Sequence, residues 1–505
     1  MIGGPLGSTR ERNPSLWLET SPNRSYERLG REVRAQAVVV GAGITGLTTA
    51  RLLTAAGMSV IVIEAGDLCA GVSGYTTAKI TSLHSALYTR LVGTWGEERA
   101  AVYASANQAA IDKVRELAAA DRIDCDLEDA SAYTYTETDR GVAVIEREAE
   151  AAGRAGLSAA VTTETDLPYP VRAAVRVDQQ AQFHPRKYCL GLAEAISRTG
   201  GSVYEHTRAL DVDGDAGRIT TDRGIIIADV IVLATQIPIA DSGGHFARME
   251  PKRSYAGAFP VSGERPRGMY ISIDEPTRSV RSTVDDWIIV GGEGHRVGQD
   301  DDTTERYAVL EAWAKERFNA TALEHRWSAQ DYESADHLPF IGRLSPGSER
   351  VLVATGFGKW GMTNGTVAAM IITDLAQGKP NGWADTFDAT RIAPRQGASG
   401  TIRANIDVAR HFVGDRLGSL KPPDVASLEP GAGAIASLDG EKVAAYRDED
   451  GTLHCVSATC THLGCQVAFN AAERSWDCPC HGSRFDIDGH VLQAPAVEDL
   501  GPKGS

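Results

Sequence analysis

The sequence predicts an α/β protein with a small all-β domain at its C-terminal end. A strand–turn–helix–strand pattern occupies residues 37–64, a strand–glycine turn–helix pattern occupies residues 351–377, and a glycine-punctuated β pattern runs from residue 425 onward. Buried strands that alternate with helices are typical of parallel α/β sheets, whereas short strands between glycine turns are typical of all-β domains. With 505 residues the chain is also too long for one compact core.

Composition narrows the class of protein. Hydrophobic residues make up 42% of the chain and charged residues 23%, which is an ordinary globular balance. The formal net charge of -16 leaves no basic surplus to neutralise phosphates, so we expect no nucleic-acid partner. No apolar run approaches the roughly 20 residues that span a bilayer, and the N-terminus lacks the apolar core of a signal peptide. We therefore expect a cytoplasmic protein without a membrane span.

The first unit carries a nucleotide-binding fingerprint. A buried strand over residues 37–40 leads directly into Gly41, Gly43 and Gly46, and the next strand ends at Glu64. In this context Gly41 permits a tight turn, Gly43 lets the backbone approach a pyrophosphate, and Gly46 lets helix and strand pack closely. The helix N-terminus offers free N–H groups to the phosphates. Glu64 would accept from ribose hydroxyls and repel a 2′-phosphate, which disfavours NADP. The alternative is a glycine turn without a ligand.

Further elements follow in order, after an irregular arm over the first three dozen residues. They are a helix over 97–120, a buried strand within 224–235, antiparallel strands around 255–290, a strand over 351–355, a glycine turn over 356–361 and a helix over about 363–377. After residue 390 the regular pattern of strands and helices ends, apart from a short helix-like piece near 403–416. We therefore expect a domain boundary between about 391 and 425.

Four motifs resemble the D-amino-acid oxidase/glycine oxidase/glycerophosphate dehydrogenase superfamily of FAD enzymes. They are Gly71-Val-Ser-Gly-Tyr-Thr-Thr-Ala-Lys-Ile80, Ala234-Thr235, Asp336-His-Leu-Pro-Phe-Ile-Gly342 and Gly356-Phe-Gly-Lys-Trp-Gly361. The resemblance covers roughly residues 35–390. It implies a Rossmann-type FAD-binding domain with an antiparallel-sheet substrate domain.

The fingerprint and the resemblance together imply a set of FAD contacts. These residues are Gly41, Gly43, Ile44, Thr45, Gly46, Glu64, Ala65, Ser73, Thr76, Thr77, Ala78, Lys79, Ala234, Thr235, Gly342, Gly356, Gly358, Lys359, Trp360, Gly361, Met362 and Thr363. At two positions the sequence differs from the sarcosine oxidase branch of this superfamily. Ala329 falls near the cysteine that tethers FAD in the sarcosine oxidase branch, so we expect noncovalent FAD. Thr363 falls where that branch has a lysine for the substrate carboxylate, so an ordinary amino-acid substrate is not assured.

Candidate catalytic residues are few. The resemblance implies that residues 356–363 approach the flavin pyrimidine edge, where amide donors and the N-terminus of the following helix would stabilise the charge of reduced flavin. Lys359 would add a full charge there, although most lysines are merely solvated. His84, Arg253 and Tyr255 are candidates to line a substrate pocket, although for each of them a structural group with satisfied hydrogen bonds is the favoured alternative.

The C-terminal part holds five of the eight cysteines. Cys460-Thr-His462-Leu-Gly-Cys465 and Cys478-Pro-Cys480-His481-Gly-Ser483 resemble the two boxes of Rieske iron–sulfur proteins. The resemblance implies that Cys460 and Cys478 bind one iron of a [2Fe–2S] cluster and that His462 and His481 bind the other. A zinc site with two cysteines and two histidines, or a plain thiol cluster, is the alternative, and both fit this spacing less well.

The same resemblance implies finer detail. It pairs Cys465 with Cys480 in a disulfide beside the cluster, and it places the Ser483 hydroxyl on a cluster sulfide. Phe485 stands where high-potential relatives carry a tyrosine that donates to a ligand sulfur. Imidazole ligands raise the potential of such clusters and fewer hydrogen bonds lower it. We therefore expect a positive potential below that of the respiratory proteins, within the roughly -150 to +300 mV Rieske range.

The resulting domain plan has four parts. They are an arm (1–35), an FAD-dependent oxidoreductase domain (36–390), a linker (391–424) and a Rieske domain (425–505). Within the second, we assign residues 36–90, 175–240 and 335–390 to FAD binding and residues 91–174 and 241–334 to the substrate domain.

This combination predicts a dehydrogenase that passes electrons from a small substrate to FAD, then singly through the cluster to an external acceptor. We favour an amine or amino-acid-like C–N bond, and a C–OH bond less. The alternatives are an electron-transfer protein that serves a partner enzyme, a flavin enzyme that runs in the reverse direction, and a redox sensor that switches through the Cys465–Cys480 pair. We do not expect a Rieske oxygenase, because those enzymes need a mononuclear iron site, normally in a domain after the Rieske module, and only a short tail follows His481 here.

Overall fold

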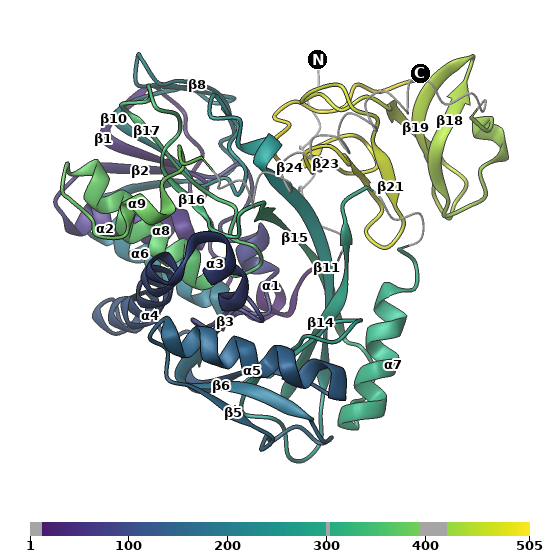
Figure 1. The fold of residues 1–505 in the computed structure, drawn as a ribbon. Coiled ribbons are helices and arrows are strands. Elements are labelled where there is room, and N and C mark those ends of the chain that lie inside the picture. The colour runs from purple at the N-terminus through teal and green to yellow at the C-terminus, as the bar shows by residue number, and fades with distance from the viewer. Residues whose placement is uncertain (1–12, 299–302, 393–421, 505) are drawn as a thin grey trace.

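The computed structural model describes residues 13–298, 303–392 and 422–504. Figure 1 shows three bodies: a parallel sheet with its helices, a second sheet below it, and a C-terminal β body beside the upper ends of β11 and β15. Within the described residues, no helix combines the length and the apolar character needed to cross a membrane.

The first sheet is the parallel sheet predicted from the glycine fingerprint. Its strands run in the order β16 (Phe340–Arg343), β17 (Val351–Thr355), β10 (Ile225–Leu233), β1 (Val33–Val40), β2 (Val60–Ile63) and β7 (Ser202–Tyr204), with the hairpin β8 (Ala209–Asp213) and β9 (Arg218–Thr221) attached to β10. Five of these strands are parallel, and β16 is antiparallel to β17. The carboxyl ends of β1, β2, β10 and β17 therefore meet at one edge, where α/β sheets bind their ligands.

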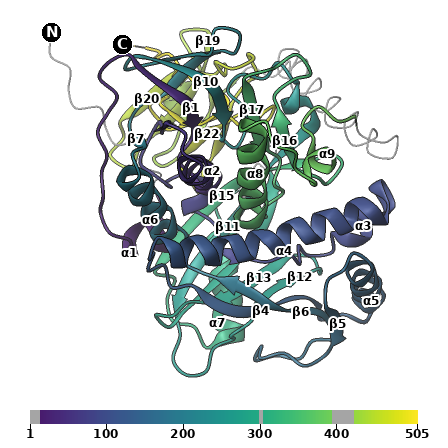
Figure 2. The ribbon, with the colours of Figure 1, turned by 90° about the vertical axis from the view of Figure 1, so that its left-hand side faces the viewer.

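Both faces of this sheet are covered. Alternate residues of a strand point to opposite faces, so Val39 packs toward the helices while Val38 and Val40 pack into the cluster on the other face. The helices are α2 (Ile44–Ala55), α3 (Tyr88–Trp95), α4 (Glu97–Ala120), α6 (Pro185–Arg198), α8 (Gly361–Ala376) and α9 (Ala384–Phe387). Figure 2 shows the long helix α4 lying across the molecule, between α8 above it and the second sheet below.

The second sheet is mostly antiparallel, as expected for a substrate domain. Its order is β15 (His325–Ser334), β11 (Met249–Pro260), β14 (Trp287–Arg296), β13 (Arg278–Ser282), β12 (Met269–Ser272), β4 (Glu128–Thr136), β6 (Ala173–Gln182) and β3 (Lys79–Ile80), with β5 (Ala159–Thr162) paired to β6. Helices α5 (Asp139–Arg154) and α7 (Arg306–Phe318) pack on it. Since β3 directly follows the predicted FAD loop, this sheet reaches the edge where the first sheet binds ligands.

The C-terminal body contains two small antiparallel sheets. One comprises β18 (Gly433–Leu438), β19 (Glu441–Arg447) and β20 (Leu453–Ser457); the other comprises β21 (Ala468–Asn470), β22 (Ser475–Asp477), β23 (Arg484–Phe485) and β24 (Val491–Gln493). A short turn, η3 (Val425–Ser427), precedes them. The expected all-β character is confirmed.

The structure differs from the expected plan in three places. The arm contains a short helix, α1 (Leu16–Thr20), whose Trp17 indole N–H donates to the Thr76 carbonyl at 2.7 Å. Strand β1 begins at Val33 rather than Ala37, because its first residues already pair with β10. Strands β3 and β6 belong to the second sheet although they lie in stretches assigned to FAD binding. The helix-like piece near residues 403–416 lies outside the described residues.

Substitution of Gly46 tests the packing of the fingerprint. A Cβ at this position of α2 would lie 1.8 Å from the Gly41 carbonyl oxygen. We expect Gly46→Ala to lower the free energy of unfolding by about 1–3 kcal/mol, as overpacking does, and to lower the FAD content of the purified protein. Thermal unfolding and flavin absorbance measure both. In Gly153→Ala, also on a helix but with open space around it, stability should hold or rise, and equal losses in both variants would contradict the packing argument.

Candidate functional site

A large cavity of about 1350 Å³ lies where the two sheets and the C-terminal body meet. It extends from Gly41 at the end of β1 to Gly356 at the end of β17, and the second sheet contributes Ser254 and Gly291 to its wall. Small-molecule sites usually measure roughly 300–1,000 Å³, so the cavity has room for a dinucleotide together with a small substrate.

The glycine turn leaves the N-terminus of α2 open to this cavity. Gly41 has φ +101°, and a Cβ there would lie 2.5 Å from the Ala234 carbonyl oxygen. Gly43 caps α2 without a side chain, and a Cβ on it would lie 2.9 Å from the Ser73 hydroxyl. That hydroxyl accepts from the Ile44 N–H at 3.0 Å. Free helix N–H groups at such a turn suit a pyrophosphate, so the residues present fit the phosphates of FAD.

Most predicted FAD contacts line the cavity. They are Gly41, Gly43, Ile44, Thr45, Glu64, Ala65, Ser73, Thr76, Thr77, Lys79, Ala234, Thr235, Gly356, Gly358, Lys359, Trp360, Gly361 and Met362. Four others do not line it: Gly46, Ala78, Gly342 and Thr363. Gly46 packs against the turn, and the Thr363 hydroxyl donates to the Thr81 carbonyl at 3.1 Å. These two residues therefore support the segments that line the cavity, although they do not line it themselves.

The second glycine turn presents Lys359 and Trp360. Lys359 has φ +73°, and its backbone N–H donates to the Asp331 carboxylate at 2.6 Å. Burial lowers the pKa of the Lys359 ammonium, while the carboxylate of Glu333 acts in the opposite direction. Burial also raises the pKa of Asp331 to about 6. The turn thus places a cation and two carboxylates at one end of the cavity.

His84 and Tyr255 both line the cavity but are held by neighbours. The His84 ring stacks on Trp360 with 4.5 Å between centroids, and its Nδ1 lies 2.6 Å from the Tyr103 hydroxyl. Burial lowers the pKa of His84 to about 3, so this imidazole is neutral at physiological pH. The Tyr255 hydroxyl lies 3.1 Å from His295 Nε2, and burial raises its pKa. Neither is a strong base in this state.

Arg253 was a candidate either for the pocket or for a structural role, and it does not line the cavity. Its neighbours Lys252, Ser254 and Tyr255 line the cavity, whereas the Arg253 side chain points toward the C-terminal body. There it is fully buried, with its Nε 3.6 Å from the carboxylate of Asp477 in the C-terminal body. Residue type alone could not reveal this, because the partner lies more than two hundred residues away.

Strand β15 is the part of the site that sequence reasoning missed. Ser328, Gln330, Asp331 and Glu333 line the cavity from this strand. Glu333 pairs with Lys252 on the adjacent strand at 2.6 Å. The signal in the sequence was a run of polar residues in a strand that is largely buried.

The two C-terminal boxes bring four candidate metal ligands together, two cysteines and two histidines. The rings of His462 and His481 are perpendicular, with 5.1 Å between centroids. Both Nδ1 atoms are buried without a hydrogen-bond partner, which is uncommon for polar atoms in a folded protein. The thiols of Cys460 and Cys478 lie within hydrogen-bonding reach of each other. Two free imidazole nitrogens and two adjoining thiols fit the donor set of a Rieske cluster.

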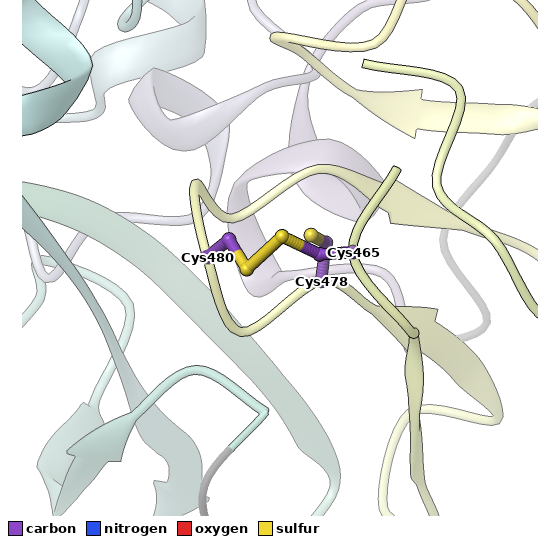
Figure 3. A group of neighbouring side chains, drawn as sticks. All are labelled: Cys465, Cys478 and Cys480. Atoms are coloured by element: carbon purple, nitrogen blue, oxygen red, sulfur yellow. A yellow bond between two sulfur atoms is a disulfide. The ribbon is translucent and has the colours of Figure 1, made fainter. Parts of the chain in front are cut away.

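Figure 3 shows the disulfide beside this site. Cys465 and Cys480 are joined, as the resemblance implied, and the Cys478 sulfur lies close to them. Because the sulfurs of Cys465 and Cys480 are bonded to each other, Cys478 is the member of this group of three whose sulfur is available to iron. The bridge joins the two ligand loops and thereby restrains His462 and His481.

Lys79 is a buried lysine whose amino group bonds to side-chain hydroxyls. It is 7% exposed, lines the cavity, and donates to the hydroxyls of Thr77 and Ser279. No carboxylate of the described chain lies within ion-pair distance of it. Burial lowers its pKa to about 7, and the neighbouring charge of Arg281 adds to this effect.

Lys79→Met should stabilise the cofactor-free protein in a pH-dependent way. Because the pKa is lower in the folded state than in the unfolded state, the charged lysine destabilises the fold below pH 7, and this cost disappears as the pH rises from about 7 to 10.5. The gain in unfolding free energy should therefore be on the order of a few kcal/mol at pH 6.5 and shrink by pH 10. Lys187→Met should instead lose stability, since Lys187 pairs with Asp126 at 2.8 Å. A gain that does not change with pH would refute the charge argument.

Ser483→Ala should lower the midpoint potential of the cluster. The Ser483 hydroxyl lies within hydrogen-bonding reach of the Cys460 sulfur, and loss of a donor to a ligand sulfur disfavours the more negative reduced state. A redox titration followed by EPR measures the shift, with Ser437→Ala on β18 as the control. An unchanged potential would mean that the hydroxyl does not act on the cluster.

Comparisons with known proteins agree with both sites. Residues 36–375 match the family model described as FAD dependent oxidoreductase, and residues 422–501 match the Rieske [2Fe-2S] domain. YhfW of Bacillus subtilis (strain 168), named as a Rieske 2Fe-2S iron-sulfur protein, is 37% identical over 499 residues, 97% of each chain. Gamma-glutamylputrescine oxidoreductase of Escherichia coli (strain K12) is 23% identical over 437 residues, 80% of this chain and 99% of the relative.

The fold is shared with solved structures. Glycine oxidase from Geobacillus kaustophilus aligns with a TM-score of 0.59 at 17% identity, over 72% of this chain and 100% of that one. At this identity the likeness establishes the fold of the first two sheets. Together with the family matches, it shows that the chain belongs to the FAD-dependent oxidoreductase family and carries a Rieske [2Fe–2S] domain at its C-terminal end.

Proposed function

We propose that this protein is a dehydrogenase that oxidises an amine or amino-acid-like C–N bond and delivers the electrons through its Rieske cluster to an external one-electron acceptor. One observation carries the proposal: strand β15 lines the flavin cavity and also contacts the cluster-binding loop, since Gln330 belongs to the cavity wall and donates to the Gly482 carbonyl at 2.7 Å. The two cofactor sites are therefore neighbours within one chain.

Each cofactor supplies a different part of this chemistry when bound. FAD takes up two electrons with hydride, and a Rieske cluster carries one electron at a time, so each substrate molecule oxidised reduces two molecules of acceptor. The chain's own contribution is to position and stabilise. The open N-terminus of α2 receives the phosphates, and Gly361 and Met362 at the start of α8 direct backbone amides toward the cavity.

The charges in the cavity support a polar nitrogenous substrate. Lys359, Asp331 and the Lys252–Glu333 pair line the same end of the cavity, and such a mixed set can bind an amine together with an acidic group. The relative named gamma-glutamylputrescine oxidoreductase and the structural neighbour named glycine oxidase point to the same class of bond. Within this proposal Lys359 faces the flavin, while His84 and Tyr255 shape the substrate pocket.

An electron-transfer protein without a substrate of its own is the second candidate. It would exchange electrons with a partner enzyme, in either direction, and a redox sensor that uses the Cys465–Cys480 disulfide would be a variant of it. The cavity argues against both, because it continues beyond the glycine turns to the second sheet, where Tyr255 and Ser279 line it. A relay would not need this space.

We place the enzyme in the cytoplasm, where its thiols Cys69, Cys125 and Cys189 stay reduced.

Anaerobic titration of the holoprotein distinguishes the two candidates. Amines, amino acids and polyol phosphates are added in turn, while flavin absorbance and the Rieske EPR signal are recorded. The dehydrogenase proposal expects that one amine-type compound bleaches the flavin and that the EPR signal of the reduced cluster then appears. If no compound reduces the flavin, but NADH with an added reductase reduces the cluster, the electron-transfer function replaces it.

A further inference from the structure

Two neighbouring side chains on one face of β15 bind the cluster loop, defined as residues 478–483. The Gln330 amide donates to the Gly482 carbonyl at 2.7 Å, and the Tyr332 hydroxyl donates to the His481 carbonyl at 3.0 Å. Residues two apart on a strand share a face, so both donors point the same way. Gln330 Nε2 also lies 3.1 Å from the Tyr332 hydroxyl, which links the two donors in one network.

The cluster loop is shaped for this contact. Gly482 has φ +76°, a conformation that favours glycine. A Cβ there would lie 2.5 Å from Gln330 Nε2 and 2.7 Å from the Tyr332 hydroxyl. On the other side, the ring of Phe246 meets the His481 ring edge-to-face with 4.8 Å between centroids. Close approach of the two domains therefore depends on the absence of a side chain at position 482.

A buried ion pair anchors the same junction. Asp477 precedes the first residue of the cluster loop, and its carboxylate lies between the guanidinium groups of Arg253, at 3.6 Å, and Arg484, at 3.1 Å. All three side chains are at most 2% exposed. Separating the domains would leave Arg253 without this partner, and a buried charge that loses its partner costs several kcal/mol.

Docking makes the two histidine ligands unequal. His481 is only 4% exposed and faces β15 and Phe246. His462 is half-buried, and its neighbour Leu463 is 47% exposed. Both imidazoles meet the Phe246 ring edge-to-face, with 4.8 Å between centroids for His481 and 6.2 Å for His462, so His481 lies deeper against the flavin domain and His462 lies nearer the outer surface.

We propose that Gln330 and Tyr332 are positioning residues that hold the cluster loop against the flavin cavity, so that electrons enter the cluster on the His481 side. The proposal rests on the cofactor pair of the proposed function but not on any substrate. In this step one electron leaves the reduced flavin and one ferric iron of the oxidised cluster becomes ferrous. An external one-electron acceptor then reoxidises the cluster from the His462 side.

Photoreduction of the holoprotein tests the proposal without a substrate. A deazaflavin with EDTA as electron donor reduces the FAD in a light pulse, and cluster absorbance reports how fast the electron arrives. We expect Tyr332→Phe to slow this transfer, and Tyr332→Phe combined with Gln330→Met to slow it by about tenfold or more, because small displacements at a positioned site have large kinetic effects. The single variant loses only one hydroxyl, so it keeps the test valid if the double variant folds poorly.

A matched control is available in the Rieske domain. Tyr446 is buried there, and its hydroxyl has no hydrogen-bond partner in the described structure. Tyr446→Phe should leave the transfer rate unchanged, and iron content and the EPR g values should be the same in all variants. If Tyr332→Phe and the double variant transfer electrons as fast as the Tyr446→Phe protein, the proposal is overturned.

Hydrogen–deuterium exchange provides a readout that is independent of electron transfer. The Cys478 and Gly482 amides bond to carbonyls within the cluster loop, at 2.8 and 2.9 Å. Loss of the β15 donors should speed exchange in this loop and leave the β18–β20 sheet unchanged. Unaltered exchange in the double variant would show that β15 does not position the loop. Because neither measurement uses a substrate, a failure to find an oxidised amine leaves this test intact.

Discussion

The contact between β15 and the cluster loop is the constraint on which the rest of the arrangement depends. It joins Gln330, in the wall of the flavin cavity, to the Gly482 carbonyl at 2.7 Å, and so links the cavity to the cluster loop. The contact is polar rather than apolar, and the Arg253–Asp477 pair beside it is buried. Polar groups that lose partners in an interior are costly, and any other orientation of the Rieske domain would lose the bonds to the Gly482 and His481 carbonyls and the Arg253–Asp477 pair. This polar network favours one docking geometry, whereas an apolar surface of the same size would be less selective for orientation.

The two cofactor sites could be predicted from sequence because their signals are local. The glycine turn after β1 and the two Cys/His boxes each place their functional groups within a few residues, and the spacing itself carries the chemistry. The cavity accordingly contains Gly41, Gly43 and Glu64. The orphaned Nδ1 atoms of His462 and His481 fit the expected ligand roles in the same way. Even the antiparallel sheet followed from alternation in the stretch around 255–290.

What the sequence could not reveal is how residues far apart in the chain meet. Nothing near Tyr332 indicates that its hydroxyl reaches the His481 carbonyl, 149 positions away. Arg253 was a candidate both for the pocket and for a structural role, and nothing near it in the sequence indicates that its partner is Asp477. Likewise β3 follows the FAD loop without a break, yet it pairs with β6 in the second sheet. These facts are set by tertiary pairing, for which one sequence contains no short-range signal.

The unequal exposure of the histidines would give the proposed electron relay a physical direction. A one-electron carrier between a two-electron flavin and a separate acceptor needs two sides, one held close to the flavin and one open to the partner. A domain whose cluster ligands were both exposed would have to move between the two positions. Here His481 is buried against the flavin domain while Leu463, next to His462, stays exposed. In the proposed relay, a domain with one inner and one outer ligand could receive an electron from the flavin and pass it to the acceptor without moving. The buried Arg253–Asp477 pair helps to hold the domain in this position.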